Sequence, residues 1–261
     1  MTFSFFDSHC HLELTAFDAD RADVVASMKQ AGIGALVVGV DSATSNEATL
    51  LAEQHEHLFS AIGLHPNDAP EESFDIDLFS SLAKHPKVVA IGECGLDYYR
   101  LPTDSTEDKK RQKELFEKHI ALSITTKKPL TIHCREAFDD LLDILRYHRS
   151  SLGAIPGVMH FFTGSIDVAR RCLDLGFMLS FSGVITFTEV YDEVVRFVPN
   201  DRLLVETDSP FATPAPNRGK RNSPLFLPLT IEAMARIRGT TADVLAPQLL
   251  TNTQSVFKVN H

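Results

Sequence analysis

A strand-like segment followed by a helix-like segment recurs eight times along this chain, and that alternation constrains the fold more than any other feature. Short apolar runs rich in β-branched residues predict strands at residues 3–6, 34–40, 58–63, 88–93, 130–133, 157–160, 177–182 and 202–207. Helical spacing predicts helices at residues 20–31, 44–55, 75–84, 106–126, 137–149, 165–175 and 189–198, with two more at 228–238 and 241–257. Eight units of ~30 residues predict a closed (β/α)8 TIM barrel, an α/β fold. The rival is an open doubly wound sheet, which more often has roughly five to seven strands.

Composition supports one globular unit. The chain has 261 residues, of which 44% are hydrophobic and 23% charged, an ordinary balance with ample material for a core. No linker or low-complexity stretch divides it, so we expect a single domain over residues 1–261. No early segment looks like a secretory signal, and no apolar run approaches the ~20 residues of a membrane helix. We expect a soluble, cytoplasmic protein with no membrane partner.

The cysteines do not predict disulfides or a thiolate site. Cys10, Cys94 and Cys134 each directly follow a candidate ligand in a strand, so alternation turns them away from it, towards the outer helices. Cys172 lies in a helical pattern. The chain has no Cys-x-x-Cys, which argues against zinc bound by thiolates.

Residues that can bind metal follow most of the predicted strands. In barrels of this kind the chemistry lies at the carboxyl ends of the strands. Those ends carry, in chain order, His9, His11, His65, Glu93, His133, His160 and Asp208. His9 and His11 are two residues apart, so alternation along a strand points both imidazoles the same way. A single such residue is commonly a hydrogen-bonded core group, but buried imidazoles and carboxylates at one level on six strands are costly unless paired or bound to metal. The pattern predicts a metal centre.

Four histidines and two carboxylates exceed the three protein ligands of an ordinary catalytic zinc. We therefore predict two divalent ions bridged by Glu93, which stands midway in strand order. The predicted ligands are His9, His11, Glu93 and Asp208 for one ion and Glu93, His133 and His160 for the other. Two divalent cations and two carboxylates leave a net charge of about +2, which favours an anionic substrate. Paired ions activate water and stabilise the attacking and leaving oxygens of phosphoryl transfer.

The same residues stand in motifs that resemble the TatD-type metal-dependent hydrolases. The motifs are Asp7-Ser-His-Cys-His11, Gly63-Leu-His-Pro66, Gly92-Glu-Cys-Gly-Leu-Asp-Tyr98, His133-Cys-Arg135, His160-Phe-Phe-Thr-Gly164, Glu206-Thr-Asp-Ser-Pro210 and Pro216-Asn-Arg-Gly-Lys-Arg-Asn-Ser-Pro224. The resemblance runs from residue 5 to about residue 257, and no ligand position departs from it. It implies a metal-dependent deoxyribonuclease on a TIM barrel, often a 3′→5′ exonuclease. It further implies that His65 contacts the scissile phosphate and that Asp208 orients or deprotonates the attacking water, with Glu93 as the third catalytic residue.

Further polar residues are candidates for binding the substrate. Arg218 and Lys220 lie with Arg221 in a basic loop after the eighth strand, where barrels often hold phosphate. The alternative for this loop is a solvated surface. Arg135 either binds substrate or forms a structural salt bridge, and Ser182 either offers its hydroxyl to phosphate or belongs to a turn. Aromatic residues near the strand ends could stack bases, although the core is the favoured place for the phenylalanines; these are Tyr98, Phe161, Phe162 and Phe181.

The net charge of −10 argues against a surface coated for non-specific duplex binding. For the deoxyribonuclease that the resemblance implies, we therefore expect single-stranded or frayed DNA ends as the substrate. Magnesium or manganese is the expected metal for activity, while histidine-rich ligation also suits zinc. Two other classes stay open: an amidohydrolase-like or deacylase enzyme that cleaves a carboxylic ester or cyclic amide, and a binding protein with an inactive site. A monomer agrees with the sequence, which does not determine the oligomeric state.

Overall fold

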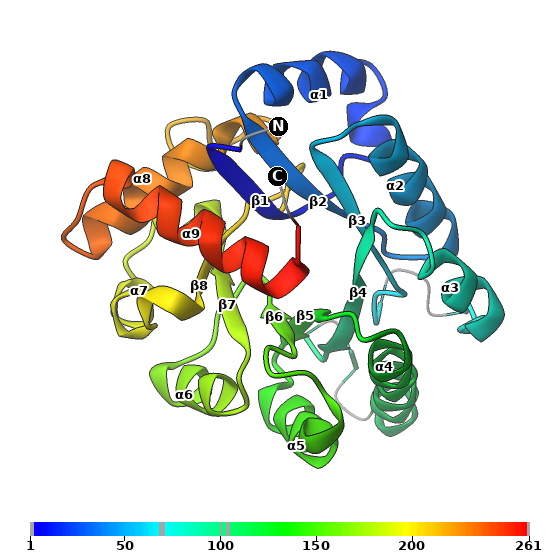
Figure 1. The fold of residues 1–261 in the computed structure, drawn as a ribbon. Coiled ribbons are helices and arrows are strands. Elements are labelled where there is room, and N and C mark those ends of the chain that lie inside the picture. The colour runs from blue at the N-terminus through cyan, green and yellow to red at the C-terminus, as the bar shows by residue number, and fades with distance from the viewer. Residues whose placement is uncertain (1–2, 68–70, 100, 103–104, 260–261) are drawn as a thin grey trace.

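The computed structural model describes residues 3–67, 71–99, 101–102 and 105–259, in which eight parallel strands form one sheet in the order β1 to β8 (Figure 1). The strands are β1 (Phe5–Cys10), β2 (Ile33–Val38), β3 (Leu58–Ile62), β4 (Val88–Asp97), β5 (Leu130–Arg135), β6 (Gly157–Met159), β7 (Met178–Phe181) and β8 (Leu203–Val205). The helices are α1 (Arg21–Gln30), α2 (Ser42–Gln54), α3 (Ile76–Leu82), α4 (Thr106–Thr126), α5 (Phe138–His148), α6 (Ile166–Asp174), α7 (Asp192–Phe197), α8 (Leu227–Ile237) and α9 (Ala242–Phe257). The predicted TIM barrel is confirmed, and the doubly wound sheet is excluded because neighbouring strands follow one another in chain order.

The barrel closes between its first and last strands through the residues that follow β8. The amide of Asp208 donates to the carbonyl of His9 at 2.9 Å, and the amide of His11 donates to the carbonyl of Ser209 at 2.8 Å. Deeper in the barrel, the Ser8 hydroxyl donates to the carbonyl of Val205 at 2.9 Å. These bonds bring residues about 200 positions apart in the chain to one end of the barrel, and they place Asp208 beside His9.

Two apolar layers hold the sheet. Along β2, Leu36 and Val38 belong to a buried cluster inside the barrel, while Ala35 and Val37 belong to the larger cluster that includes the helices. This division is what the alternation of side chains along a strand requires. The inner cluster also contains Phe257, so the end of α9 closes the barrel at the amino ends of the strands.

The cysteines lie where strand alternation predicts. Cys10, Cys94 and Cys134 are buried in the outer cluster with helix residues, and Cys172 is buried in α6. All four are free thiols.

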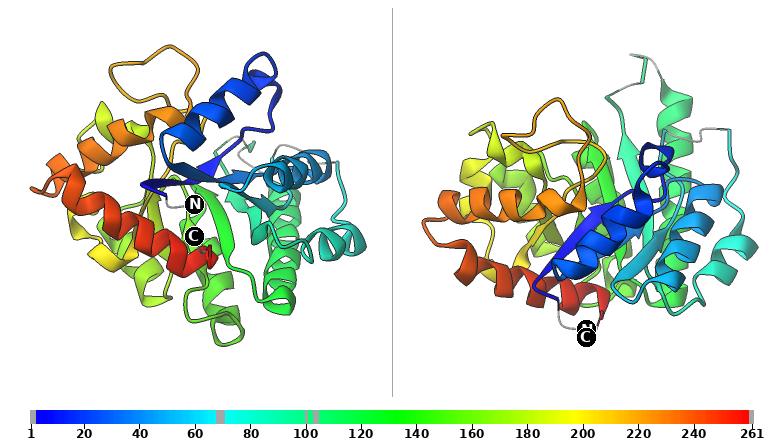
Figure 2. Two further views of the ribbon diagram at one scale, coloured as in Figure 1. Left: turned by 45° about the horizontal axis from the view of Figure 1, so that its top comes forward. Right: turned by 90° about the horizontal axis from the view of Figure 1, so that it is seen from above.

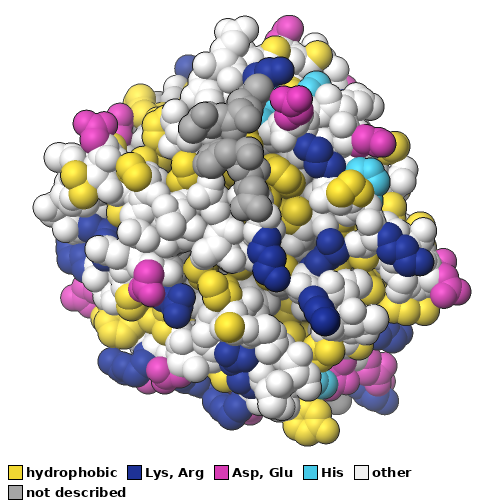
Figure 3. Space-filling view, viewed as in Figure 1, with side chains coloured by type: hydrophobic (Ala, Val, Ile, Leu, Met, Phe, Trp, Pro, Cys, Tyr) yellow, Lys and Arg dark blue, Asp and Glu magenta, His cyan; other side chains and the backbone are white. Residues whose placement is uncertain are grey.

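The termini and the site lie at opposite ends of the barrel. Both chain ends meet at one end, while the orange loop after β8 rises at the other (Figure 2, right). The face with the termini displays scattered Lys and Arg side chains (Figure 3), which are thus remote from the carboxyl ends of the strands. No helix within the described part of the chain is long and apolar enough to cross a membrane.

Two strands depart from regular pairing at the residues predicted to bind metal. The first strand spans Phe5–Cys10 instead of residues 3–6, and its register with β2 shifts between Asp7 and Cys10. The register of β4 with β5 shifts between Ile91 and Cys94. Irregularities of this kind re-aim a side chain, and they commonly occur beside active sites. At both shifts the side chain that is re-aimed belongs to a predicted ligand, His9 or Glu93.

Gly92 shows why β4 can follow this path. Its φ of +140° lies in a region that side chains disfavour, and a Cβ there would come within 2.2 Å of the carbonyl oxygen of Thr131. Only glycine allows β4 to approach β5 so closely directly before Glu93. We therefore attribute the position of the Glu93 carboxylate to this glycine.

A buried histidine outside the site holds the loop that carries His65. The Nε2 atom of His119 in α4 accepts a hydrogen bond from the amide of Leu64 at 2.9 Å, and its Nδ1 donates to the carbonyl of Leu115 at 2.8 Å. Burial lowers the pKa of His119 to about 4. The ring is therefore neutral at pH 7, with its proton on Nδ1.

This histidine should make stability depend on pH. Below about pH 6.5 the unfolded chain protonates His119 while the folded protein does not, so its stabilisation is complete above that pH and is lost as the pH falls towards 4. We expect the difference in unfolding free energy between wild type and His119→Gln to narrow by about 2 kcal/mol between roughly pH 8 and pH 5. Urea unfolding at both pH values measures it. A difference independent of pH would contradict the assignment.

Candidate metal centre

The barrel brings all six predicted metal ligands together at the carboxyl ends of its strands. They come from β1 and the residue after it, β4, β5, the residue after β6, and the segment after β8: His9, His11, Glu93, His133, His160 and Asp208. Their side chains are mostly buried, from 0% exposed for His9 to 19% for His133. Parallel strands in a barrel end at one level, which explains why residues far apart in the sequence meet here.

One group of ligand atoms gathers around Oε2 of Glu93. The Nε2 atoms of His9 and His11 lie 3.4 and 3.7 Å from this oxygen and 3.2 Å from each other. Oδ1 of Asp208 lies 3.4 Å from Nε2 of His11 and 4.0 Å from Nε2 of His9. These four residues are the set predicted for one ion.

A second group gathers around the other oxygen of the same carboxylate. Oε1 of Glu93 lies 2.9 Å from Nε2 of His160 and 3.1 Å from Nδ1 of His133. Nε2 of His65 is 3.6 Å from this oxygen. Glu93 thus presents one oxygen to each ligand group, which is the geometry expected of a bridging carboxylate.

The outer nitrogens of the ligand histidines also have partners, which fix the orientation of the rings. Nδ1 of His11 donates to the carbonyl of Val38 at 2.7 Å, and Nδ1 of His9 lies 3.3 Å from the hydroxyl oxygen of Thr131. Groups of this kind set which nitrogen of a histidine faces the metal. The inward-facing nitrogens of both rings are therefore free to bind a cation.

Three carboxylates behind the histidines were not predicted from the sequence. Asp97 Oδ2 lies 3.1 Å from Nε2 of His133, Glu206 Oε1 lies 3.3 Å from Nδ1 of His160, and Glu13 Oε1 lies 3.5 Å from Nδ1 of His11. Asp97 and Glu206 stand in the quoted motifs, at strand ends, which is the signal that could have indicated them. Carboxylates in this position raise the basicity of a ligand histidine.

The electrostatics of the centre favour cations. Burial opposes ionisation of Glu93, but His160, His65 and His133 outweigh it and hold the pKa of this carboxyl well below its usual value. Burial lowers the pKa of His9 to about 3, so its ring is neutral. For His160, burial is outweighed by the carboxylates of Glu93 and Glu206, which raise its pKa to about 10. Carboxylates that favour an imidazolium ion in this way would favour a metal cation in its place.

The donor atoms fit divalent ions. Imidazole nitrogens and carboxylate oxygens suit zinc and manganese as well as iron, and no thiolate contributes. Among the described residues, potential ligand atoms lie within 4.8 Å of one another in four groups, two of which are His9 with His11 and Glu93, and Glu93 with His133 and His160. These two groups hold five of the six predicted ligands, and Asp208 lies beside the first of them.

The predicted substrate-binding arginines lie at the surface around this centre. Arg135 at the end of β5 is exposed, and its guanidinium carbon lies 3.5 Å from the centroid of the Tyr99 ring. Arg218 is also exposed and stacks on Phe187 at 3.8 Å. Among the described residues, neither guanidinium lies within 4.0 Å of a carboxylate, so the salt-bridge alternative for Arg135 is not seen.

The remaining candidates for substrate binding differ in their exposure and in their contacts. Lys220 is exposed in the same loop as Arg218. Arg221 is instead tied to Asp20 by two hydrogen bonds of 2.7 and 2.8 Å. Ser182 is buried after β7, and its hydroxyl has no hydrogen-bond partner within the described chain. Phe162 and Phe181 are core residues, as favoured from the sequence.

A buried carboxylate joining two groups of ligands at the mouth of a (β/α)8 barrel defines a class of protein, the metal-dependent hydrolases. Comparison with known proteins narrows this class. The family model described as TatD related DNase matches residues 6–258. The chain therefore belongs to the TatD-related DNase family, in agreement with the motifs.

Relatives along the full chain support this placement. The uncharacterized metal-dependent hydrolase YabD of Bacillus subtilis is 40% identical over 98% of this chain and 99% of its own. The 3′-5′ ssDNA/RNA exonuclease TatD of Erwinia amylovora is 36% identical over 97% of this chain and 99% of its own. The crystal structure of YJJV, a TatD homologue from Escherichia coli, has a TM-score of 0.88 at 29% identity and covers 100% of both chains.

Proposed function

We propose that this hydrolase is a deoxyribonuclease that uses two divalent ions to hydrolyse phosphodiester bonds from the 3′ end of single-stranded DNA. The observation that carries the proposal is the Glu93 carboxylate, with Oε2 towards His9 and His11 and Oε1 towards His133 and His160. A bridged pair of ions is a recurrent device for displacement at phosphorus. The choice of DNA and of the 3′ end is supported by the family and by relatives named 3′-5′ ssDNA/RNA exonuclease.

The ligand residues would hold one ion on each side of Glu93. When bound, the ions supply Lewis-acid stabilisation of the phosphoryl oxygens and water acidic enough to attack at neutral pH. Magnesium or manganese is proposed for activity, with zinc as the alternative that the histidine-rich donor set also suits.

Two residues act on the reacting groups in this proposal. Asp208, whose side chain is 13% exposed, orients the attacking water and accepts its proton. Its φ of +53° is a strained conformation for aspartate, which fits a residue held in place for function. His65, 3.6 Å from Glu93, donates to the scissile phosphate.

Arg135, Arg218, Lys220 and Ser182 are proposed to bind the substrate. The arginines and the lysine are exposed around the mouth, where they can reach phosphates away from the scissile bond. Ser182 is buried, and its hydroxyl, which has no hydrogen-bond partner among the described residues, is the group proposed to bind phosphate. A monomer in the cytoplasm is proposed as well, and the four free thiols fit a reducing compartment.

The test is a panel of substrates for metal-stripped protein, to which magnesium, manganese and zinc are restored in turn. A single-stranded oligodeoxynucleotide should be cleaved, while carboxylic esters and a cyclic amide should not. Cleavage of the carbonyl substrates alone would favour the amidohydrolase-like alternative. Activity on none of them, with metals bound, would indicate a binding protein.

The basic loop provides a separate prediction. If Arg218 and Lys220 contact phosphates, the double variant Arg218→Ala/Lys220→Ala should raise KM and flatten the dependence of activity on salt, because fewer counterions are released on binding. At 50 to 200 mM salt we expect a loss of about tenfold in kcat/KM, with unchanged metal content. KM measured across a salt series checks this, with Arg146→Ala on the outside of α5 as the matched control. An unaltered KM would assign the loop to a solvated surface.

A further inference from the structure

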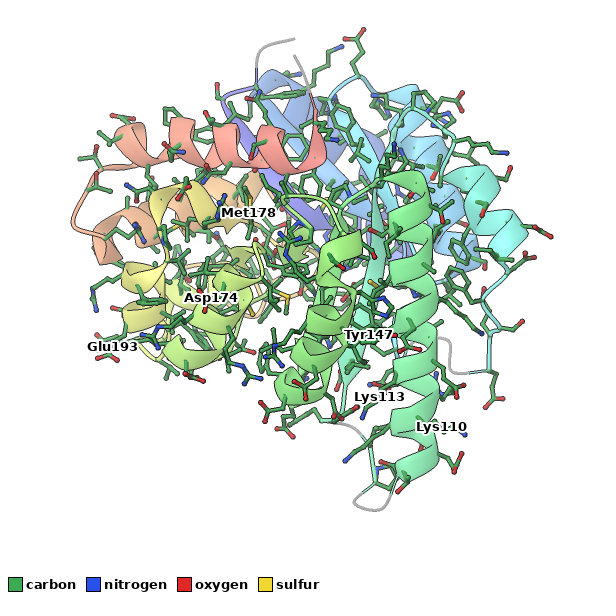
Figure 4. The ribbon with its side chains drawn as sticks, turned by 60° about the horizontal axis from the view of Figure 1, so that its bottom comes forward. Lys110, Lys113, Tyr147, Asp174, Met178 and Glu193 are labelled. Carbon is green, nitrogen blue, oxygen red and sulfur yellow. The ribbon has the colours of Figure 1, made fainter. Side chains whose placement is uncertain are left out.

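Exposed aromatic rings cluster at the mouth of the barrel. The chain has 18 phenylalanines and 4 tyrosines, and nearly all of those that the structure describes are buried or half-buried. The exposed ones among the described residues are Tyr99, Tyr147, Phe187 and Phe211. Tyr99, Phe187 and Phe211 follow the carboxyl ends of β4, β7 and β8, whereas Tyr147 projects from α5 (Figure 4). The fold thus presents three apolar rings to solvent around the metal centre.

Phe211 lies beside the metal centre. It is three residues beyond Asp208, and its ring centroid is 6.0 Å from that of His11, with 67° between the planes. Although so close to a buried ligand, the side chain is 54% exposed. The ring therefore faces solvent directly beside a predicted metal ligand, within reach of a substrate bound at the metal centre.

The backbone of Phe211 is firmly held. Its amide donates to the carbonyl of Asp208 at 2.8 Å, and its carbonyl accepts from Nδ2 of Asn222 at 2.6 Å. Asn222 is fully buried, and the same amide group donates to the carbonyl of Thr207 at 2.8 Å. The ring therefore stands on a fixed loop next to the ligand Asp208, so little ordering entropy would be lost when a planar group binds to it.

An arginine side chain stacks on each of the other two rings. The guanidinium of Arg135 lies over Tyr99 and that of Arg218 lies over Phe187, at 3.5 and 3.8 Å from the ring centroids. A guanidinium stacked on a ring keeps its N–H edge available for phosphate. The mouth thus combines cations that suit a phosphate backbone with an open ring, Phe211, that has no such partner among the described residues.

We propose that Phe211 stacks on a nucleobase adjoining the scissile phosphodiester and makes the enzyme select substrates whose terminal bases are unpaired. The inference rests on the proposed nuclease function and adds a specificity residue to it. Stacking on an aromatic ring accepts any base, because every base has a π-face. A base inside a duplex is covered on both faces, and the base at a blunt end is held by its pairing partner and its one neighbour. A duplex end must therefore fray before the scissile phosphodiester and its adjoining base can lie at the metal centre and Phe211 together.

The test compares two oligodeoxynucleotides that are identical except at the 3′ end. One carries normal bases, and in the other the nucleotides on both sides of the terminal scissile bond are abasic. For wild type, kcat/KM should be about tenfold lower on the abasic substrate, the scale of one stacking interaction. Phe211→Leu should lose about tenfold on the normal substrate, mainly through KM, and should equal wild type on the abasic one. Phe211→Tyr should retain both values.

Controls separate stacking from damage to the site. Metal content of each variant is measured, and Tyr147→Ala, which removes an exposed ring far from the mouth, should match wild type on both substrates. A Phe211→Leu variant that loses activity equally on both substrates, or on neither, overturns the stacking role while the nuclease function stands. Wild type that cuts neither oligonucleotide with any of the three metals overturns the nuclease function itself, and the stacking proposal with it.

Discussion

Replacing Glu93 with alanine should remove both metal ions and nearly all activity. Oε1 and Oε2 of this carboxylate face different groups of ligands, so its loss takes one donor from each group and the bridge between them. Loss of a hydrogen-bond partner behind a ligand typically costs ~10–100-fold in metal affinity or activity. Loss of a ligand shared by both ions should reduce metal affinity and activity further. We expect kcat/KM to fall by at least about a thousandfold. Elemental analysis after equilibration with manganese, together with kinetics, measures both effects.

A graded set of variants makes this result specific. His160→Ala touches only the group on the Oε1 side, so it should empty mainly one site and leave about one ion per chain. Glu117→Ala removes an exposed carboxylate on α4 and should behave as wild type. If Glu93→Ala kept two ions, or lost no more metal than His160→Ala, Glu93 would not be the bridge.

A circular single strand should survive conditions in which the same linear strand is degraded. The ligand side chains are 0–19% exposed at the carboxyl ends of the strands, and loops follow these ends. A free single-stranded end can reach these ligands, whereas a closed strand must bend sharply and a stiff duplex must melt. The net charge of −10 leaves little basic surface along which a duplex could lie.

The experiment incubates enzyme and magnesium with a linear oligonucleotide, its circular form and a blunt duplex. The linear strand should shorten stepwise from its 3′ end, and the duplex should be degraded more slowly. We expect the linear oligonucleotide to be cleaved at least about a hundredfold faster than its circular form. The linear strand and the duplex carry a label at the 5′ end, the circle carries an internal label, and a gel resolves the products of all three. If the circular oligonucleotide were cleaved as fast as the linear one, internal phosphodiesters would reach the metal centre and the enzyme would be an endonuclease.

Much of the site can be predicted from the sequence, because the barrel brings residues at the ends of different strands close together. Once strands alternate with helices eight times, every strand end lies at the same end of the barrel. His9 and Glu93 then meet His133, His160 and Asp208 regardless of their separation in the chain. The assignment of Glu93 as the bridge needed only its middle place in strand order, and its two oxygens do face the two predicted groups.

Other features depend on contacts that no spacing rule determines. Arg221 stood in the basic loop beside Arg218, but only tertiary packing could reveal its pairing with Asp20. The shift in β1 between Asp7 and Cys10 is likewise invisible to a period-two pattern. Phe211 directly follows the motif that ends at Pro210, yet no sequence pattern indicates that its ring is exposed.

The central claim of the account is that two ions lie on opposite sides of Glu93. Anomalous diffraction from crystals of the manganese-loaded protein tests it most directly, because the ions themselves are located. We predict two peaks, one within coordinating distance of His9, His11 and Asp208 and the other within that distance of His133 and His160, with Glu93 contacting both. A single peak at saturating manganese, or two peaks that share no Glu93 contact, would contradict the two-metal mechanism.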